Sequence, residues 1–192
     1  MVTMKERRIK LGVLVAAGVA AAVLMSAPWE NDRDPTVARA VAELEGQWVG
    51  RSAEAFQLPD LRGRNHRLRD YRGKVVFLNF WASFCKPCKR EMPSMETLAR
   101  EYHGRGMEMI AVSLDQKERD ASRFLQQFLP NESSAMTVLW DPESRVANAY
   151  GTELIPETYI IDRDGTVVAR FVNEYDWTRP EVKRLVEALL TS

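Results

Sequence analysis

The only two cysteines of this 192-residue chain, Cys85 and Cys88, stand three positions apart, directly after a strand-like apolar run at residues 75–80. Thiols at positions i and i+3 of a first helical turn are close enough to form a disulfide. The helix N-terminus also favours negative charge on the first sulfur. Such a pair can cycle between dithiol and disulfide by thiolate exchange. The pattern therefore indicates a redox pair where a strand gives way to a helix.

Two other uses of the cysteine pair stay open at this point. A closed zinc site needs four ligands, and besides the two cysteines the chain has only two histidines, His66 and His103, in no ligand-like cluster. A buried structural disulfide without redox turnover is the second alternative. We favour the redox interpretation and expect no metal and no cofactor.

The N-terminal segment predicts where this chemistry takes place. Lys5, Arg7, Arg8 and Lys10 precede an uncharged apolar run at residues 11–27, and acidic residues follow it. At about 1.5 Å per residue the run would be roughly 25 Å long as a helix, the short end of what spans a bilayer. Basic residues before the run and acidic residues after it predict an N-terminus inside and a body outside.

We expect residues 1–27 to remain as an uncleaved, single-pass anchor in the inner or cytoplasmic membrane, with the C-terminal domain on the periplasmic face. A cleaved signal peptide is the alternative, because its basic and apolar regions look the same. Met25-Ser26-Ala27 lacks a clean small-residue cleavage site. In either case the body lies outside the cytoplasm, where thiols stay reduced only if a partner reduces them.

Composition narrows the choice of class. The 27 basic and 27 acidic residues give a formal charge of zero, which argues against a nucleic-acid-binding surface. The chain beyond the anchor is long enough for one domain with its own core. We expect an anchor or signal segment at 1–27, a tether at 28–50 with a short helix at 36–45, and a single domain at 51–192.

Within that domain, apolar runs typical of buried strands alternate with helical spacing of apolar residues. Asp164-Gly165 predicts a hairpin turn, and Gly63 marks a second turn. This order predicts an α/β sheet with mixed strand directions. We expect strands at 74–80, 107–114, 137–140, 158–162 and 166–172, helices at 86–103, 118–129, 143–150 and 179–190, and a hairpin within 56–68.

Two stretches resemble the membrane-anchored thioredoxin-like reductases of the TlpA, ResA and CcmG type, within the AhpC/TSA-redoxin superfamily. The first is RDYRGKVVFLNFWASFCKPCKREMP at residues 69–93, and the second is YGTELIPETYIID at residues 150–162. The likeness covers about residues 51–190. It implies a thioredoxin-like fold, with a mixed central sheet flanked by helices, an N-terminal β-hairpin extension and an extra helix–strand insertion before the cis-proline loop.

The resemblance also assigns residues around the pair. It makes Pro156, preceded by Ile155, the cis-proline that faces the cysteines. Glu91 matches an acidic residue that ResA-like proteins place near the thiols, and Glu157 resembles the Pro-Glu-Thr of the cytochrome-maturation branch. A solvated glutamate is the alternative for both. Thioredoxin has a buried aspartate where this chain has Asn79, so that proton acceptor is missing.

Two neighbours of the cysteines complete the candidate site. Lys86, next to Pro87, should favour a thiolate at Cys85, because a nearby positive charge lowers a thiol pKa. Trp81 should pack around the site rather than take part in the chemistry.

These observations predict an exported thiol–disulfide oxidoreductase. Cys85 would attack a client disulfide, and Cys88 would resolve the mixed disulfide. The resemblance implies reduction, with electrons from a membrane thiol donor of the CcdA or DsbD type and apocytochrome c as the client. A reductant for copper-site maturation in an oxidase is the alternative enzyme, and a copper(I)-binding chaperone is the alternative outside the enzymes.

Overall fold

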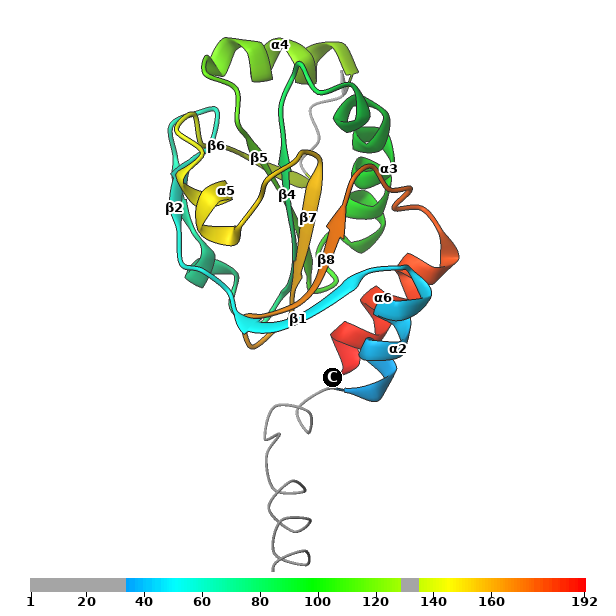
Figure 1. Cartoon of the computed structure of the whole chain (residues 1–192). Coiled ribbons are helices and arrows are strands. Elements are labelled where there is room, and N and C mark those ends of the chain that lie inside the picture. The colour runs from blue at the N-terminus through cyan, green and yellow to red at the C-terminus, as the bar shows by residue number, and fades with distance from the viewer. Residues whose placement is uncertain (1–33, 129–134) are drawn as a thin grey trace, which may run out of the picture. The chain divides into compact units, whose positions relative to one another are not determined.

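Strand β4 (Val75–Trp81) is buried along its whole length, as its continuous apolar sequence predicts. The computed structural model describes residues 34–128 and 135–192, and in it β4 lies inside a six-stranded sheet with the order β1-β8-β7-β4-β5-β6 (Figure 1). On one side β4 pairs in parallel with β5, which pairs in parallel with β6. On the other side β7, β8 and β1 follow in antiparallel pairings, so the strand directions are mixed, as expected. The bounds are β1 Gln47–Ser52, β5 Met107–Ser113, β6 Met136–Trp140, β7 Glu157–Ile161 and β8 Thr166–Val172.

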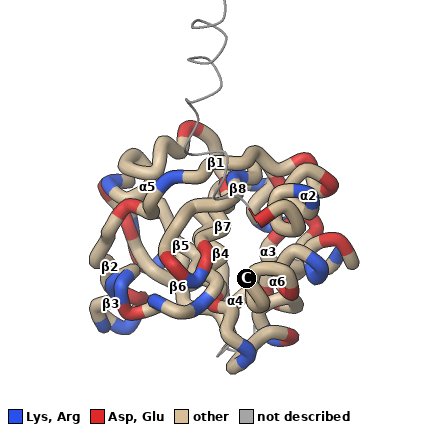
Figure 2. Tube along the Cα trace, turned by 90° about the horizontal axis from the view of Figure 1, so that it is seen from below, with Lys and Arg blue, Asp and Glu red and all other residues tan. Residues whose placement is uncertain are grey.

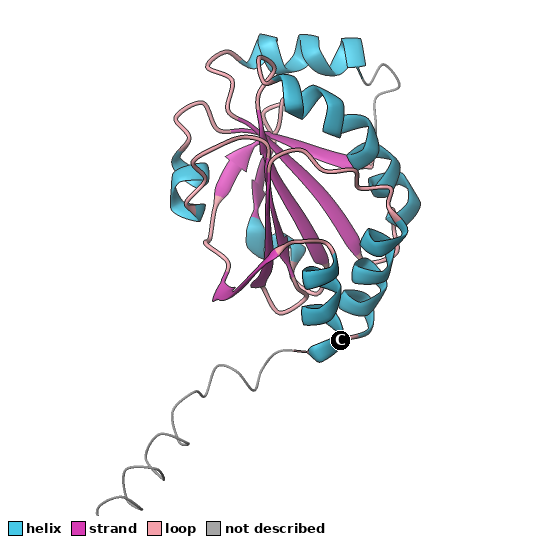
Figure 3. Cartoon of the chain, turned by 45° about the vertical axis from the view of Figure 1, so that its right-hand side comes forward, coloured by secondary structure: helices cyan, strands magenta, loops and turns pink. Residues whose placement is uncertain are grey.

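Helices cover both faces of the sheet (Figure 3). The side chains of β4 alternate between two apolar clusters, because successive residues of a strand point to opposite faces. Phe77 belongs to the cluster under α2, α3, α4 and α6, whereas Leu78 belongs to the cluster under α5 and the N-terminal hairpin. The helices are α2 Pro35–Glu43, α3 Lys86–Tyr102, α4 Glu118–Phe128, α5 Arg145–Tyr150 and α6 Pro180–Thr191, with the 3₁₀ helix η1 at Leu68–Tyr71.

The predicted hairpin is present as β2 (Gln57–Pro59) and β3 (Asn65–Arg67), which form a separate two-stranded sheet. Gly63 lies in its turn with φ +78°, a left-handed conformation that glycine adopts without steric cost. The expected insertion is present too, because α4, β6 and α5 all lie between β5 and the start of β7. The fold is therefore thioredoxin-like, with both predicted additions.

The predicted tether at 28–50 needs a correction over its described part. Its helix is present as α2, but β1 begins at Gln47 and pairs with β8 at the sheet edge, with Gln47 opposite Arg170. The residues from Asp34 to Ser192 form one compact unit. The domain therefore begins well before residue 51. Strand β1 has only two apolar residues, Trp48 and Val49, and because they are adjacent the sequence shows no alternating pattern that would indicate a strand.

The predicted anchor or signal segment at 1–27 lies outside the described residues. Among the residues that are described, no helix is both long enough and apolar enough to cross a membrane.

Buried Asp60 holds the β2–β3 hairpin closed. Its Oδ1 accepts hydrogen bonds from the backbone N–H groups of Arg62 and Arg64, at 2.9 and 2.8 Å, and its Oδ2 accepts one from Arg64 Nε at 2.8 Å. Burial alone would raise the pKa of Asp60, but these hydrogen bonds outweigh it and lower the pKa to about 2. The charged carboxylate is therefore part of the folded hairpin.

We predict that Asp60→Asn lowers the free energy of unfolding at pH 7 by about 2 kcal/mol, the equivalent of the pKa shift. The folded pKa lies below the unfolded value of 3.8, so this contribution is present above pH 3.8 and is lost as the pH falls through about 2. Urea denaturation of both proteins between pH 2 and pH 7 measures it. Asp70→Asn, at an exposed carboxylate of η1, is the matched control and should lose much less. A gap between Asp60→Asn and the unmodified protein that does not change with pH would contradict this account.

Candidate active site

The cysteine pair lies at the junction of β4 and α3, and the structure has it as a disulfide. Cys85 is the N-cap residue of α3, and its Sγ accepts a hydrogen bond from the N–H of Cys88 at 3.2 Å. Pro87 lies in the first turn, where its missing N–H leaves no intrahelical bond unmade. The helix N-terminus therefore directs its positive end toward Cys85 Sγ.

A second segment meets the disulfide from β7. The Ile155–Pro156 peptide bond is cis, as the motif predicted, and Pro156 is buried directly before the first residue of β7. The carbonyl oxygen of Ile155 lies 3.6 Å from Cys85 Sγ. Antiparallel pairing of Phe80 with Glu157 brings these two segments together. A peptide bound beside this loop would lie next to the first sulfur.

The two sulfurs differ in access to solvent. Cys85 is 7% exposed and Cys88 is 1% exposed. Phe84 precedes the first cysteine and Leu154 precedes Ile155, and both are large apolar side chains exposed at 72% and 64%. Lys86 is also exposed. The rim of the site thus presents apolar surface and a positive charge around the accessible sulfur.

Glu91 lies one helical turn beyond Cys88 and is almost fully buried. Its Oε1 accepts a hydrogen bond from the indole N–H of Trp177, while its Oε2 is buried without a hydrogen-bond partner among the described residues. Burial raises the pKa of Glu91 to about 8, although the Trp177 hydrogen bond opposes the rise. The carboxyl group therefore holds a proton at neutral pH, and the solvated-glutamate alternative is wrong for this residue.

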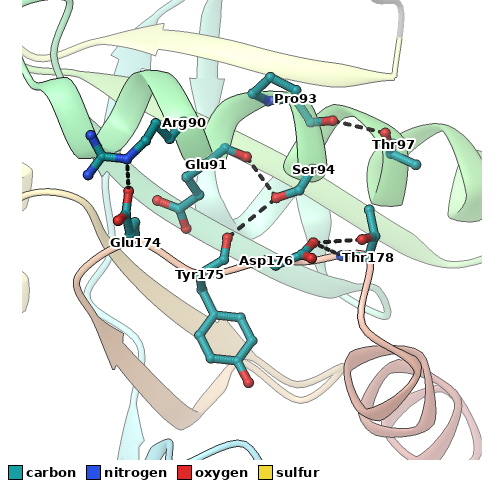
Figure 4. A pocket seen from close by; sticks show the side chains of 9 residues that line it. All are labelled: Arg90, Glu91, Pro93, Ser94, Thr97, Glu174, Tyr175, Asp176 and Thr178. Carbon is teal, nitrogen blue, oxygen red and sulfur yellow. Dashed lines mark hydrogen bonds and ion pairs between the residues drawn. The ribbon is translucent and has the colours of Figure 1, made fainter.

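The segment between β8 and α6 covers Glu91 (Figure 4). Ser94 Oγ donates to the carbonyl oxygen of Glu91 at 2.7 Å and accepts the backbone N–H of Trp177 at 3.1 Å. Arg90 pairs with Glu174 at 2.6 Å at the exposed edge. An open pocket lies beside α3. Its lining includes Arg90, Glu91, Ser94, Glu174, Tyr175 and Asp176. Residues 173–178 are thus fixed to the helix that carries the cysteines.

Glu157 is completely buried, directly after the cis-proline. It pairs with Arg170 on β8, and its Oε2 has no hydrogen-bond partner among the described residues. The exposed-glutamate alternative is therefore wrong for this residue as well. Its charge is neutralised within the sheet, one residue from the loop that meets Cys85.

Asn79 and Trp81 lie on β4 and are buried. Asn79 Nδ2 donates to Thr158 Oγ1 on β7 at 2.9 Å, so the amide joins two strands beneath the site. The Trp81 ring packs 4.9 Å, centroid to centroid, from Phe124 of α4. Trp81 is placed for packing, in agreement with its predicted role.

Two residues whose polar groups hold the site together, Trp177 and Asp115, were not predicted from the sequence. Buried Asp115 follows β5 and accepts hydrogen bonds from the N–H and Oγ of Ser83, at 2.9 and 2.7 Å, two residues before Cys85. Both residues lie in polar segments without periodicity. A tryptophan inside the charged stretch around residues 173–179 was the one available signal, because such a residue needs a partner for its N–H when buried.

A model of the AhpC/TSA family matches residues 49–170. The chain belongs to this family. It is 39% identical over 141 residues to the thiol-disulfide oxidoreductase ResA of Geobacillus thermodenitrificans, which covers 73% of this chain and 78% of that protein. It is 35% identical to ResA of Bacillus anthracis over 133 residues, or 69% of this chain and 75% of that protein.

A solved structure from Chlorobium tepidum, of a protein assigned as thiol:disulfide interchange protein DsbE, superposes with a TM-score of 0.66 and 35% identity. It covers 73% of this chain and 96% of that chain. A second family model, CDP-alcohol phosphatidyltransferase 2, matches only residues 8–30, too short a segment to show a family. This member of the AhpC/TSA family is therefore a thiol–disulfide oxidoreductase with a thioredoxin-like fold, and Cys85 and Cys88 form its CxxC pair.

We predict that Trp177→Phe raises the pKa of Glu91 further above its ordinary value. The variant keeps most of the ring but removes the N–H that stabilises the carboxylate. The chemical shift of the Glu91 carboxyl carbon, followed by NMR across pH 6 to 10, measures the change. Trp140→Phe is the matched control, because that indole N–H donates instead to the carbonyl of Asp115. An unchanged or lower pKa in Trp177→Phe would show that this hydrogen bond does not act on Glu91.

Proposed function

We propose that the protein is an exported, membrane-tethered reductant of disulfides in client proteins. The burial of Cys88 and Glu91, one turn apart on α3, is the observation that carries the direction of electron flow. Surroundings that keep the Glu91 carboxyl protonated also disfavour a thiolate on Cys88. DsbA is a strong oxidant because its reduced form is stabilised. Here Cys85 alone is stabilised as a thiolate, whereas burial opposes a thiolate on Cys88.

The chemistry begins with the reduced pair. The Cys85 thiolate, at the helix N-terminus and beside the exposed ammonium group of Lys86, attacks one sulfur of a client disulfide and forms a mixed disulfide. The other client sulfur leaves as a thiolate. Cys88 then attacks Cys85 Sγ, which releases the second client thiol and closes the protein's own disulfide. The client gains the two electrons that the pair loses.

Glu91 is our candidate for the group that exchanges a proton with Cys88 during resolution, because it lies one helical turn beyond Cys88 on α3. Cys88 must lose its proton before it attacks. With a pKa of about 8, close to the ordinary thiol value of about 8.5, the Glu91 carboxyl group is ionised in a minor fraction of molecules near neutral pH, and in that form it can accept this proton. The cis-proline loop, with Ile155 and Pro156, positions the client against Cys85, and buried Glu157 supports that loop from β7. Asn79 and Trp81 hold β4 beneath it.

Apocytochrome c is the client that we propose, and a membrane thiol donor of the CcdA or DsbD type is the proposed source of electrons. The Pro-Glu-Thr sequence at 156–158 supports this client through its resemblance to the cytochrome-maturation branch. Reduction of a copper-site client remains the alternative within the same chemistry.

The attachment that we propose is a single anchor at residues 1–27 in the inner or cytoplasmic membrane. The uncharged run at 11–27 with basic residues before it supports this location. Within the described unit, α2 begins at the end of the sheet opposite the N-terminus of α3 (Figure 1). The cysteine pair therefore lies far from the point at which the chain enters the domain.

We predict that Cys88→Ser accumulates a mixed disulfide with the client, because the attacking thiolate remains and the resolving thiol is gone. Cys85→Ser should trap at least tenfold less, because Cys88 is 1% exposed. Non-reducing gels and mass spectrometry of the adducts measure the trapping and identify the client.

The opposite pattern, with trapping by Cys85→Ser alone, would invert the roles of the two sulfurs. The copper(I)-chaperone alternative predicts no covalent adduct in either variant and no insulin reduction. An oxidase copper subunit in place of apocytochrome c in the adduct would favour the copper-maturation client.

We predict that the full chain stays in the membrane pellet after a carbonate wash, because an uncleaved apolar segment of this length remains inserted. N-terminal sequencing of the purified protein is the companion measurement. A soluble mature form that begins near Pro28 would show that residues 1–27 are a cleaved signal peptide.

A further inference from the structure

A small basic pocket lies at the opposite end of the sheet from the disulfide. The cysteines follow the carboxyl end of β4, whereas this pocket surrounds the amino end of the same strand, roughly 20 Å away for a strand of this length. Its volume is about 130 Å³, several times the roughly 30 Å³ that one water takes up in the liquid. Its charged lining residues are Arg69, Arg72, Lys74, Asp162 and Arg163.

The three arginines of this pocket are exposed and have no carboxylate partner in the described part of the chain. Among the described residues, Arg163 donates only to the backbone carbonyls of Gly73 and Leu190, each at 3.3 Å. Arg72 lies against Gly165, where an added Cβ would stand 2.3 Å from its Nη1. The guanidinium of Arg72 thus lies over the β7–β8 turn, and no residue within 34–128 and 135–192 is its charge partner.

The acidic groups near the pocket are already engaged. Lys74 pairs with Glu108 at 2.6 Å, which leaves that lysine neutralised. Asp162 is the one acidic residue in the pocket lining, and its Oδ1 accepts the backbone N–H groups of Asp164 and Thr166, at 3.0 and 2.8 Å. The arginines therefore supply positive charge that the nearby acidic groups do not fully neutralise.

The pocket lies at the same end of the domain as Asp34, the residue at which the compact unit begins. The last turn of α6 is fixed there by the hydrogen bond between Arg163 and Leu190. Helix α2 packs on α6, with Glu43 at its end 3.7 Å from Arg184, so Asp34 at its start lies toward the end of α6. Figures 1 and 3 show the start of α2 beside the C-terminus, and Figure 2, from below, shows further basic residues beside β2 and β3.

We propose that Arg69, Arg72 and Arg163 bind the headgroup of an anionic phospholipid and hold the domain with its disulfide facing away from the membrane. This inference rests on the proposed membrane attachment. Guanidinium groups pair with phosphate through two parallel hydrogen bonds, and basic residues close to an anionic bilayer are attracted to it. A membrane-attached chain also presents this pocket to lipid at high effective concentration.

The test uses the full chain in nanodiscs of phosphatidylcholine, with or without phosphatidylglycerol. Hydrogen exchange of the amides at 68–75 and 162–166 should slow at least about threefold in the discs with phosphatidylglycerol. The effect should vanish at high salt, which screens exposed charges. Arg69→Glu with Arg72→Glu should abolish it. The matched control, Arg119→Glu with Arg123→Glu on α4, makes the same charge change at the other end of the sheet and should keep it. Insulin reduction by both double variants verifies that each is folded.

Equal exchange in the two kinds of disc, or equal loss in the control variant, would overturn the lipid site. The same protection by inorganic phosphate in discs without phosphatidylglycerol would make the ligand a soluble anion, which also overturns it. Retention of the chain in phosphatidylcholine discs measures the anchor separately. The chain could fail to be retained in phosphatidylcholine discs and still float with phosphatidylglycerol vesicles. If that flotation depends on Arg69 and Arg72, the result would refute the anchor and support the lipid site.

Discussion

Antiparallel pairing between β4 and β7 brings together the two segments that form the site, the one with Cys85 and the cis-proline loop. The last pair, Phe80 with Glu157, lies where β4 ends and β7 begins, at the same end of the sheet. From there the chain runs on to Cys85 in one direction and back to the cis-proline in the other. Two segments 70 residues apart in sequence thereby meet with Cys85 Sγ 3.6 Å from the carbonyl oxygen of Ile155. A shift of one residue in this register would turn every side chain to the opposite face and separate them.

The second constraint is the buried carboxyl group behind the cysteines. Glu91 is accommodated only because the segment after β8 brings Trp177 against α3 and supplies a hydrogen-bond donor. Trp177 is itself held by edge-to-face packing on Phe77 and Phe171 in the core under the helices. The proton affinity of a group one turn from Cys88 thus depends on packing of the whole face, so changes in that core should be felt in the redox chemistry.

Much of this arrangement could be predicted from sequence because its signals are local. The continuous apolar run of β4, the spacing of Cys85 and Cys88, and the motif around Pro156 each lie within a few residues, and the structure agrees with them. Edge strand β1 was missed, because its two apolar residues, Trp48 and Val49, are adjacent and give no alternating apolar pattern. The Glu91–Trp177 hydrogen bond spans 86 residues, and nothing in either local sequence indicates its partner.

We propose that this pair of sulfurs gives up electrons to its clients. Equilibration of the full chain with glutathione buffers of known ratio, read by the fraction of the Cys85–Cys88 disulfide, measures it directly. We expect a reduction potential near the value of about −270 mV for thioredoxin, because burial disfavours a thiolate on Cys88. A potential close to the value of about −120 mV for DsbA would contradict it and assign the protein to oxidation of its clients.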